Sequence, residues 1–317
     1  MRSSRLALVA ALALSCAAAL HADNTRTLNR RLPEWLEAMF TAADQKTIPL
    51  ETITLTVPEE ADAKPNQARA EVVTLGPFWK MAALIEMRAG EANLRNVTQP
   101  LGPKRSEADF EVAIEPPTIR EGDVDKLRGA SEDLAALADH LVADNAVKLE
   151  QLLASRPVPI TLFGKTVSRL PVRFTLSGPR AAVLSRLAQL PGALPFAYLR
   201  MVKATPSADL TVSASLNLLG KATATPAPST SPAAEIQRAA TDKLTAAGVP
   251  DVKVVISSAP AADSTILSLK GTARDIASAK AALLAAIAFP GLRAFDELGW
   301  KNDGGNLQLT GLLHFGL

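Results

Sequence analysis

Residues that could carry out chemistry are few in this chain, and they lie far apart in the sequence. Its three histidines are His21, His140 and His314. His21 follows an apolar N-terminal segment, His140 stands in a predicted helix, and His314 alternates outward from apolar neighbours in the last predicted strand. Because zinc sites and Ser-His-Asp triads need several such groups together, the sequence predicts no catalytic residue and no metal ligand.

Two other patterns invite a chemical interpretation, and both fit turns better. Glu107, Asp109 and Asp209 could form acid–base pairs, but they recur at the start of equivalent predicted strands, where turn hydrogen bonds are expected. Gly164-Lys165-Thr166 resembles part of a phosphate-binding loop. However, Pro159 stands where the first glycine of such a loop belongs, and a strand follows instead of a helix. We therefore predict a hairpin turn there and no cofactor.

Signatures of enzymes and of nucleic-acid binding are missing as well. The sequence contains neither G-x-S-x-G nor H-E-x-x-H. The 34 basic and 32 acidic residues are interspersed and leave a net charge of +2, which argues against a nucleic-acid partner. We expect a protein that is not an enzyme, with a secreted hydrolase or transferase as an alternative.

A repeated unit dominates the rest of the chain. Three segments read as a strand, a glycine, a helix and a second strand, beginning at 70–77, 172–179 and 266–271. Gly-Pro follows the first strand in two of the copies. We predict strand-to-helix turns at three glycines, namely Gly76, Gly178 and Gly271, because glycine tolerates the positive φ of tight turns.

A helix and a strand precede each repeated unit. Apolar residues from Leu32 to Ala43 recur with helical spacing, and 236–248 reads as a helix that ends at Gly248. The order is then helix, strand, strand, helix, strand, strand, three times. This order predicts an α+β chain of three tandem two-layer sandwiches (αββαββ), a circular permutation of the ferredoxin-like arrangement.

Three local signals refine this expectation. Leucines continue through 123–153, which we interpret as a helix that breaks near Asp144-Asn145 or serves as a docking helix, with the next strand at 160–163. Thr272-Ala273-Arg274-Asp275 predicts the capped start of the last helix. Asn302-Asp303-Gly304-Gly305 predicts a hairpin turn.

The domain boundaries follow from composition and are listed at the end of this paragraph. The Pro/Thr/Ala-rich stretch before the third module has no large apolar residue, so we expect this module to be the most mobile of the three. The predicted segments are a signal peptide at 1–22, modules at 23–121 and 122–219, a linker at 220–231, and a third module at 232–317.

The N-terminal segment has the layout of a secretory signal peptide. Arg2 and Arg5 precede an apolar run over 6–20, and small residues lead to a predicted cleavage after Ala22. The only cysteine, Cys16, lies in this run and could instead be lipidated. We therefore expect a periplasmic or envelope-associated protein, anchored in the membrane if the segment is retained or Cys16 is lipidated. A mature chain without cysteine can form no disulfide.

Phe78 and Trp79 open the second helix of the first module, where the second module has small or charged residues. They could fill a gap in the core or form an exposed contact patch, since Trp is frequent at interface hot spots. The repeat also predicts which side chains face the helices, and truncation of one of them, Leu187→Ala, is expected to cost about 2–5 kcal/mol of stability. These side chains are Leu75, Leu176, Met81, Val183, Ile85 and Leu187.

Within the second module, the stretch from Pro171 to Leu219 contains Ser177-Gly178, Leu190-Pro191 and a closing strand at 210–218. This stretch resembles the PilO-type periplasmic domain of type IV pilus alignment complexes and is similar to the M-type assembly-platform proteins of type II secretion. The third module, through 236–248 and Ser268-Leu269-Lys270-Gly271-Thr272, also resembles the BON domain of envelope proteins. Both resemblances imply structural roles and carry over no catalytic residue.

These resemblances imply two functions. The first is a non-enzymatic exported scaffold of a pilus or secretion apparatus that binds other envelope components or itself through edge strands and helix faces. The alternative is a BON-like envelope protein whose third module contacts phospholipid peripherally. Sparse clustering of Lys and Arg speaks against the second function, because anionic membranes attract grouped basic residues.

Overall fold

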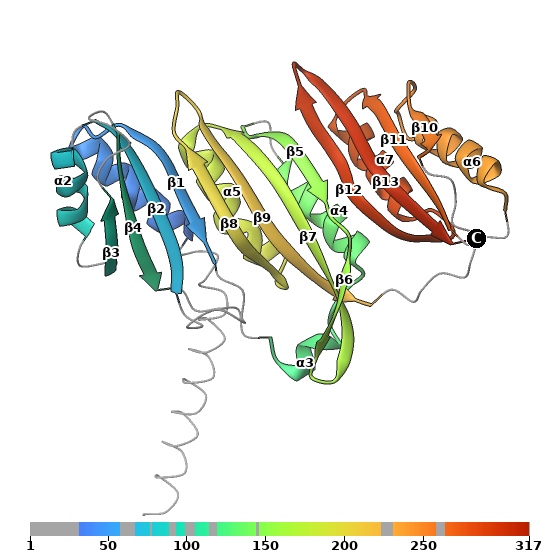
Figure 1. The fold of residues 1–317 in the computed structure, drawn as a ribbon, viewed down its shortest axis with the longest axis horizontal. Helices are drawn as coiled ribbons and strands as arrows, with labels where there is room; N and C mark the ends of the chain where they lie inside the picture. Colours follow the sequence, from blue (N-terminus) through green and yellow to red (C-terminus); the bar gives the residue numbers. More distant parts are fainter. Residues whose placement is uncertain are drawn as a thin grey trace, which may run out of the picture. The chain divides into compact units, whose positions relative to one another are not determined.

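The structure, a computed structural model, describes most of the chain and shows a mixed α+β fold (Figure 1). The predicted signal peptide and the greater part of the predicted linker lie outside the described residues. The described residues are 32–57, 67–76, 78–88, 93–98, 105–113, 119–143, 146–222, 231–257 and 264–316.

The chain divides into two compact units. Unit 1 takes in the residues up to Thr118 and Leu184–Pro195, and unit 2 takes in Ile119–Val183 and Phe196–Leu317. Among the described residues, no helix is both long and apolar enough to cross a membrane.

Unit 1 contains a helix over residues 32–45 and an antiparallel sheet in the order β1-β2-β4-β3. The predicted helix is confirmed, and its apolar residues from Leu32 to Ala43 are buried. Met81 and Leu84 of α2 and Ile53 of β1 are also fully buried, so helices and sheet share one core. The other elements are β1 (Leu50–Thr56), β2 (Gln67–Leu75), α2 (Phe78–Arg88), β3 (Asn93–Thr98) and β4 (Arg105–Ala113).

Unit 2 contains two further sets of four strands. Their orders are β5-β7-β9-β8 and β10-β11-β13-β12, and every pairing is antiparallel. The elements are α3 (Glu121–Val124), α4 (Ala130–Leu141), β5 (Lys148–Ala154), β6 (Val158–Leu162), β7 (Lys165–Gly178), β8 (Ala197–Thr205), β9 (Leu210–Lys221), α6 (Ala233–Ala246), β10 (Lys253–Ile256), β11 (Ser264–Ala273), α7 (Ile276–Ile287), β12 (Leu292–Asp303) and β13 (Asn306–Gly316). The helix α5 (Arg180–Ala193) begins in unit 2 and belongs to unit 1 from Leu184 on.

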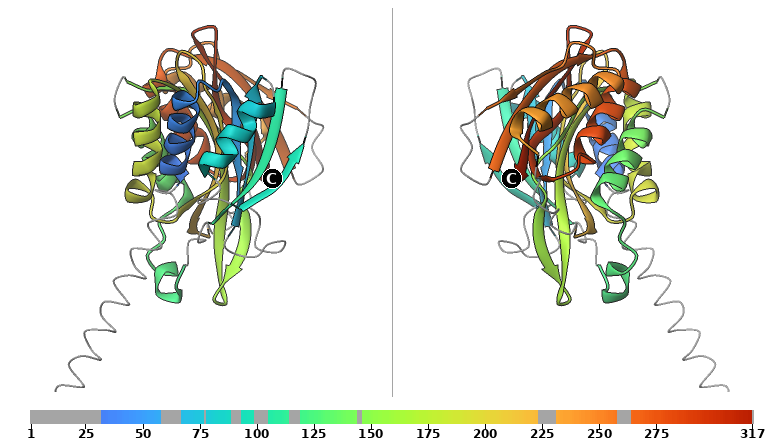
Figure 2. Two further views of the ribbon diagram at one scale, coloured as in Figure 1. Left: turned by 90° about the vertical axis from the view of Figure 1, so that its left-hand side faces the viewer. Right: turned by 90° about the vertical axis from the view of Figure 1, so that its right-hand side faces the viewer.

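Each of the three sets places its strands in the same spatial order: first, second, fourth, third. In unit 2, α4 contacts β7 and β9, α6 contacts β10, and α7 contacts the strands β11 to β13, so these helices cover one face of the sheet (Figure 2). We call the opposite side the outer face.

The second and third sets form one continuous sheet, because β12 pairs with β5. Four residue pairs make this junction, from Leu298 opposite Ala154 to Lys301 opposite Gln151. The helices α4 and α7 also meet there, where Lys280 forms an ion pair with Asp139. The third set is therefore joined to the second through strand pairing as well as through the linker, a contact that the sequence did not reveal because edge pairing needs no special composition.

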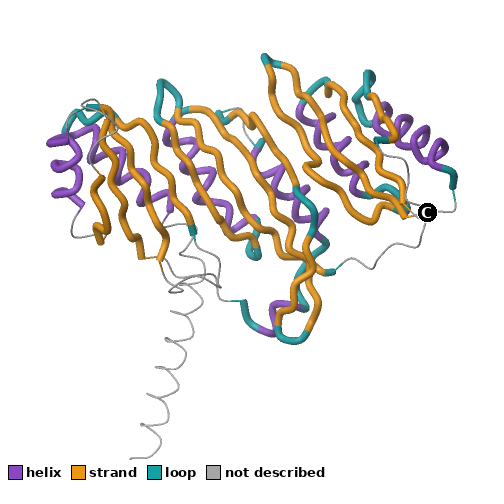
Figure 3. The backbone as a smooth tube through the Cα atoms, viewed as in Figure 1, coloured by secondary structure: helices purple, strands orange, loops and turns teal. Residues whose placement is uncertain are grey.

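The hairpin β6–β7 is an addition to the second set and extends past the other strands, with the short helix α3 beside it (Figure 3). Val124, Leu127, Val167 and Leu219 form a small separate core under it. Lys165 near the tip donates a hydrogen bond to Asp125 at 2.6 Å, which ties the hairpin to the segment after α3.

This arrangement corrects the predicted long helix over 123–153. The helix ends at Leu141, and Leu149 and Leu152 lie in β5, the first strand of the set. A β-bulge between Leu149 and Gln151 shifts the strand by one residue, so its buried leucines are three positions apart, as in a helix. The strand predicted at 160–163 is β6, and Asp144 and Asn145 lie outside the described residues.

Two of the three predicted turn glycines are confirmed. Gly76 (φ 129°) and Gly178 (φ 152°) stand between a strand and a helix, and a Cβ on Gly178 would lie 2.7 Å from the carbonyl oxygen of Ala146. Gly271 instead lies inside β11, opposite Leu309. Its role is close packing, because a Cβ there would lie 2.6 Å from a methyl carbon of Val249.

The predicted inward side chains are buried with one exception. Met81, Leu176, Val183 and Leu187 are buried, whereas Leu75 is 46% exposed, and the side chain of Ile85 lies outside the described residues. Thr74, not Leu75, matches Leu176 when the two turn glycines are aligned. A slip of one residue along a strand moves a side chain to the other face, which explains the error.

Other predicted boundaries shift by a few residues. The cap of α7 is Asp275, which accepts a hydrogen bond from the Ser278 amide at 2.7 Å, and Thr272 belongs to β11. β9 continues through Lys221, so 220 and 221 belong to a strand and not to a linker. The hairpin turn at Gly304-Gly305 is confirmed, with positive φ at both glycines.

Candidate functional site

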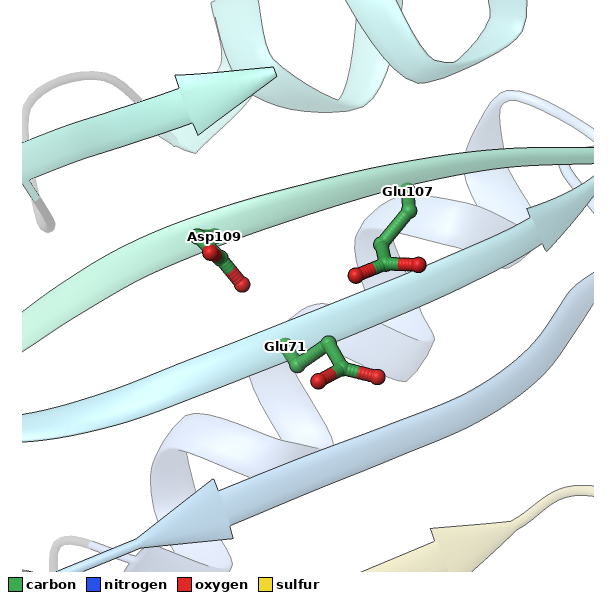
Figure 4. Close-up of side chains that lie close together, drawn as sticks. All are labelled: Glu71, Glu107 and Asp109. Carbon is green, nitrogen blue, oxygen red and sulfur yellow. The ribbon is translucent and has the colours of Figure 1, made fainter. Parts of the chain in front are cut away.

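The outer face of unit 1 carries a cluster of three carboxylates, which we call the acidic cluster: Glu71, Glu107 and Asp109. Glu71 of β2 stands directly opposite Asp109 of β4, and Glu107 is the next outward residue along β4 (Figure 4). One oxygen of each lies within 4.8 Å of the others. The inward neighbours Val72, Ala108 and Phe110 are buried, so strand alternation places these acids on the uncovered side.

Counter-charges are unevenly distributed around the acidic cluster. Arg69 pairs with Asp109 at 2.6 Å, and Arg105 pairs with Glu51 at 2.5 Å. Burial raises the pKa of Glu107, and the neighbouring charges of Glu71 and Asp109 raise it further. Carboxylate oxygens are ligands for hard cations. The arrangement therefore concentrates negative charge on this face, where a metal ion or a basic side chain would neutralise it.

Of these acids, only Asp209 lies in the turn before a strand, as predicted. The hydrogen bond found in that turn runs from the Ser207 hydroxyl to the Asp209 carbonyl oxygen, immediately before β9 begins, whereas the prediction had side chains accepting from backbone amides. Glu107 and Asp109 instead lie within β4, which begins at Arg105. Their partner Glu71 was missed because the sheet register, and not sequence proximity, brings it to them.

His314 belongs to a second polar group, at the junction of β5 and β12. It is half-buried and faces outward, as predicted, and its Nε2 lies 2.8 Å from Asp296. Arg156, which follows β5, binds the same carboxylate with Nε and Nη2 at 3.0 and 3.1 Å. Burial acts to raise the pKa of Asp296, but the hydrogen bonds from Arg156 and His314 outweigh it and leave this pKa lowered.

Further polar pairs cross the same junction on the outer face. Arg173 of β7 pairs with Glu297 of β12 at 2.7 Å. Glu150 of β5 accepts hydrogen bonds from Ser177 at 2.8 Å and from Asn302 of β12 at 2.6 Å. These carboxylates therefore hold two strand sets together, and the group around His314 is a structural contact.

The predicted contact patch is confirmed as exposed at one of its two residues. The Trp79 side chain is 65% exposed and does not fill a core gap, with the Lys80 ammonium 5.8 Å from its ring centroid. The side chain of Phe78 lies outside the described residues. A large exposed indole is suited to binding another protein.

Two lysines stand together at the far end of unit 2. Lys253 of β10 is directly opposite Lys270 of β11 on the outer face, and both are exposed beside Val255, which is 55% exposed. Like charges in directly opposed positions destabilise a sheet. The sequence analysis missed this pair because the lysines are 17 residues apart, a separation closed only by strand pairing.

The remaining predicted residues have simple outcomes. The loop at Phe163-Gly164 is a two-residue hairpin turn with positive φ at both residues, as predicted for the apparent phosphate loop. His140 is half-buried in the last turn of α4. His21 and Cys16 lie outside the described residues.

Comparison with known proteins adds no assignment. The chain matches no protein-family model, no curated protein and no solved structure.

Proposed function

We propose that this chain is an exported, non-enzymatic scaffold of an envelope apparatus similar to a type IV pilus or type II secretion machine. The observation that carries the proposal is the threefold occurrence of one strand order, with helices on one face of the sheet in unit 2. Three similar sheet-and-helix sets provide extended surfaces for protein contacts. The polar groups found at the β5–β12 junction are used for structure and not for chemistry.

The fold itself supports the resemblance to PilO-type and M-type domains. We infer that each set is a circularly permuted ferredoxin-like sandwich, because moving the first strand of a βαββαβ chain to its end gives αββαββ. The described elements follow this order in all three sets, with α3 and β6 as additions to the second. Likeness of fold supports a structural role and names no partner.

The surfaces offered to partners differ in quality. The hairpin strand β6 is a poor docking edge. The backbone of residue 159 points away from β7, toward the open edge, and Pro159 has no amide hydrogen with which a docking strand could pair. Trp79 of α2 is the better anchor, since it is exposed on a helix. We propose that it contacts another component of the apparatus, in the periplasm or at the membrane surface.

Cross-linking in the native cell tests this function. A tagged chain is expected to recover pilus-like or secretion-like envelope proteins, and Trp79→Ala should lower that recovery at least about fivefold, as for an interface hot spot. Phe163→Ala, on the exposed hairpin tip, is the matched control and should leave recovery unchanged. Failure to recover any envelope protein would contradict the proposal.

A second function, peripheral contact with anionic phospholipid, is favoured by Lys253 and Lys270 beside the exposed Val255. Grouped basic residues and an apolar side chain are features of membrane-surface binding. Co-sedimentation of the whole exported chain with anionic and with neutral vesicles separates the two functions. Binding that is lost in Lys253→Glu/Lys270→Glu supports lipid contact, and no binding at low salt removes it.

A further inference from the structure

We propose that copies of this chain associate head to tail, with β3 of one copy adding to the free edge of β10 in the next. The proposal goes beyond the scaffold function and does not depend on which machine the chain serves. Its basis is the β5–β12 junction inside unit 2, which serves as a template for a junction between two molecules.

The two strands that would meet occupy the same places as β5 and β12. β5 and β10 are each the first strand in their own set of four. β12 and β3 are each the third strand along the chain in their own set. Among the described residues, β10 pairs only with β11 and β3 pairs only with β4. The internal junction needs four residue pairs, and β10 has four residues.

Backbone groups of β10 point to the open side. The Ser257 amide donates to the Ile266 carbonyl of β11 at 2.9 Å. Because successive residues of an antiparallel strand alternate in direction, Val254 and Ile256 direct their amides and carbonyls away from β11. The Gln237 side chain of α6 donates to the Val254 carbonyl at 2.6 Å and thus occupies one of these positions. A second strand must displace this amide.

Charge follows the same pattern at the internal and at the proposed junction. Inside unit 2, Arg173 of the second set crosses β5 to reach Glu297 of β12. At the proposed junction, Lys253 and Lys270 of one copy would face the acidic cluster of another copy across β3. Two strand spacings, about 9.6 Å, separate the strands of Arg173 and Glu297, and the same spacing would separate Lys253 from Glu107 and Asp109 on β4 of the other copy, within reach of long side chains. The lysine pair alone has an excess of positive charge, and the acidic cluster alone has an excess of negative charge. In the proposed contact, each surface would neutralise the excess charge of the other.

The symmetry of this contact does not stop association at a dimer. Two different surfaces meet, so the contact is heterologous and builds either a ring or an open series that ends in a free β10 edge and a free β3 edge. A contact between two identical surfaces would stop at a dimer.

Sedimentation velocity of the exported chain over a range of protein and salt concentrations tests the proposal. We expect dimers and higher oligomers that grow with concentration and dissociate with salt. Ile256→Pro removes an outward amide and should raise the dissociation constant at least about tenfold. Gln237→Leu frees the Val254 carbonyl and should lower the dissociation constant between about twofold and tenfold.

A charge-reversal pair gives the sharpest test. Lys253→Glu/Lys270→Glu makes both surfaces acidic, and Glu71→Lys/Glu107→Lys makes both basic, so each variant alone should be monomeric. An equimolar mixture should associate again, since each variant supplies the charge that the other lacks. Circular dichroism checks that each variant is folded, and Asp303→Lys, at the exposed end of β12, is a matched charge control.

Four results obtained with the protein alone would overturn the proposal. The first is that both the native chain and Gln237→Leu stay monomeric at every concentration, and the second is that association stops at a closed dimer. The third is association that neither Ile256→Pro nor charge reversal changes. The fourth is that the two charge-reversed variants do not associate when they are mixed. Association only in the presence of anionic vesicles would assign the lysines to lipid and would also overturn it.

Discussion

Two regions place several carboxylates on the outer face of a sheet, and they differ in what surrounds the acids. At the β5–β12 junction, Asp296 and Glu297 each bind a guanidinium, and Glu150 binds a hydroxyl and an amide. In the acidic cluster of unit 1, Arg69 pairs with Asp109, while the charges of Arg105 and Arg69 only partly offset the repulsion at Glu107. The pKa of Asp296 is lowered, whereas that of Glu107 is raised.

This difference separates acids that stabilise the fold from acids that remain available. The ionised form of Asp296 contributes to the folded state, because folding brings it to Arg156 of the second strand set and to His314 of the neighbouring strand β13. The ionised form of Glu107 is unfavourable in the isolated chain, because its carboxylate is partly buried and because Glu71 and Asp109 beside it are also acids. A surface that keeps such repulsion is complementary to a cationic partner, as the proposed β3–β10 contact would provide.

The largest expected effect comes from Gly299→Val, which breaks the junction itself. A Cβ at this position would lie 1.9 Å from the Leu152 carbonyl oxygen, a backbone atom that cannot move while β12 pairs with β5. We expect the free energy of unfolding to fall by at least about 3 kcal/mol, at the upper end for overpacked sites. Urea unfolding followed by circular dichroism should show a separate early transition for the third strand set.

The control for Gly299→Val is Gly122→Ala, where a Cβ would meet no atom within 4 Å. This variant should unfold like the native chain. If Gly299→Val unfolds in the same single transition at the same urea concentration, the β5–β12 junction does not hold the two sets together.

A smaller effect is expected for Asp296→Asn, which removes the charge that Arg156 and His314 share. We expect a loss of roughly 1 kcal/mol at neutral pH, because the ion pair is partly exposed to solvent. The pKa of Asp296 is lowered by folding, so its contribution is present above the ordinary aspartate pKa of about 4. It is lost as the pH falls through the lowered value.

The pH dependence of the urea midpoint measures this contribution. Below about pH 4, the native junction should weaken more steeply than that of Asp296→Asn. Asp303→Asn, at the exposed end of the same strand, should keep the native pH profile. Parallel profiles for the native chain and Asp296→Asn would mean that this carboxylate adds nothing to the junction.

The smallest effect, of opposite sign, is expected for Glu107→Gln. The raised pKa of Glu107 means that the folded state binds this proton more tightly than the unfolded state does. The free energy of unfolding therefore falls as the pH rises from the ordinary glutamate pKa of about 4.3 through the raised pKa of the folded state. Replacing the carboxylate by an amide should raise the stability of unit 1 at neutral pH by at most about 0.5 kcal/mol.

Glu51→Gln is the comparison for this variant, because it removes an acid that has its own arginine. It should lower the stability of unit 1 slightly, since Arg105 loses its partner. A stability loss in Glu107→Gln as large as that in Glu51→Gln would show that Glu107 has a stabilising partner in the folded chain, contrary to the contrast drawn above.

Much of the local structure was determined by the sequence itself. The helix from Leu32 is predicted because apolar residues at spacings of three and four place one stripe against the core. The turn at Gly304-Gly305 and the strand-to-helix turns at Gly76 and Gly178 are predicted because a positive φ strongly favours glycine. These features depend on a few adjacent residues, so the chain specifies them without reference to distant contacts.

The sequence predicted less well which segments are strands and which face of the sheet each side chain occupies, and the reasons lie in the geometry of strands. The bulge in β5 gives Leu149 and Leu152 a helical spacing, which produced the wrong prediction of a long helix. Leu75 was assigned to the wrong face because a strand has a period of two and tolerates no error in register. Gly271 had the pattern of a turn, and only the packing of Val249 against β11 shows its actual role.

The tertiary structure alone decided which distant residues act together. Strand pairing brings Glu71 to Asp109 and Lys253 to Lys270. The register of such a pairing cannot be predicted from the sequence of either strand alone. The β5–β12 junction depends on backbone hydrogen bonds, which every residue except proline can form. The sequence therefore determined helices and turns through side-chain pattern and glycine geometry, whereas charge clusters and edge contacts arose only where the folded backbone aligned them.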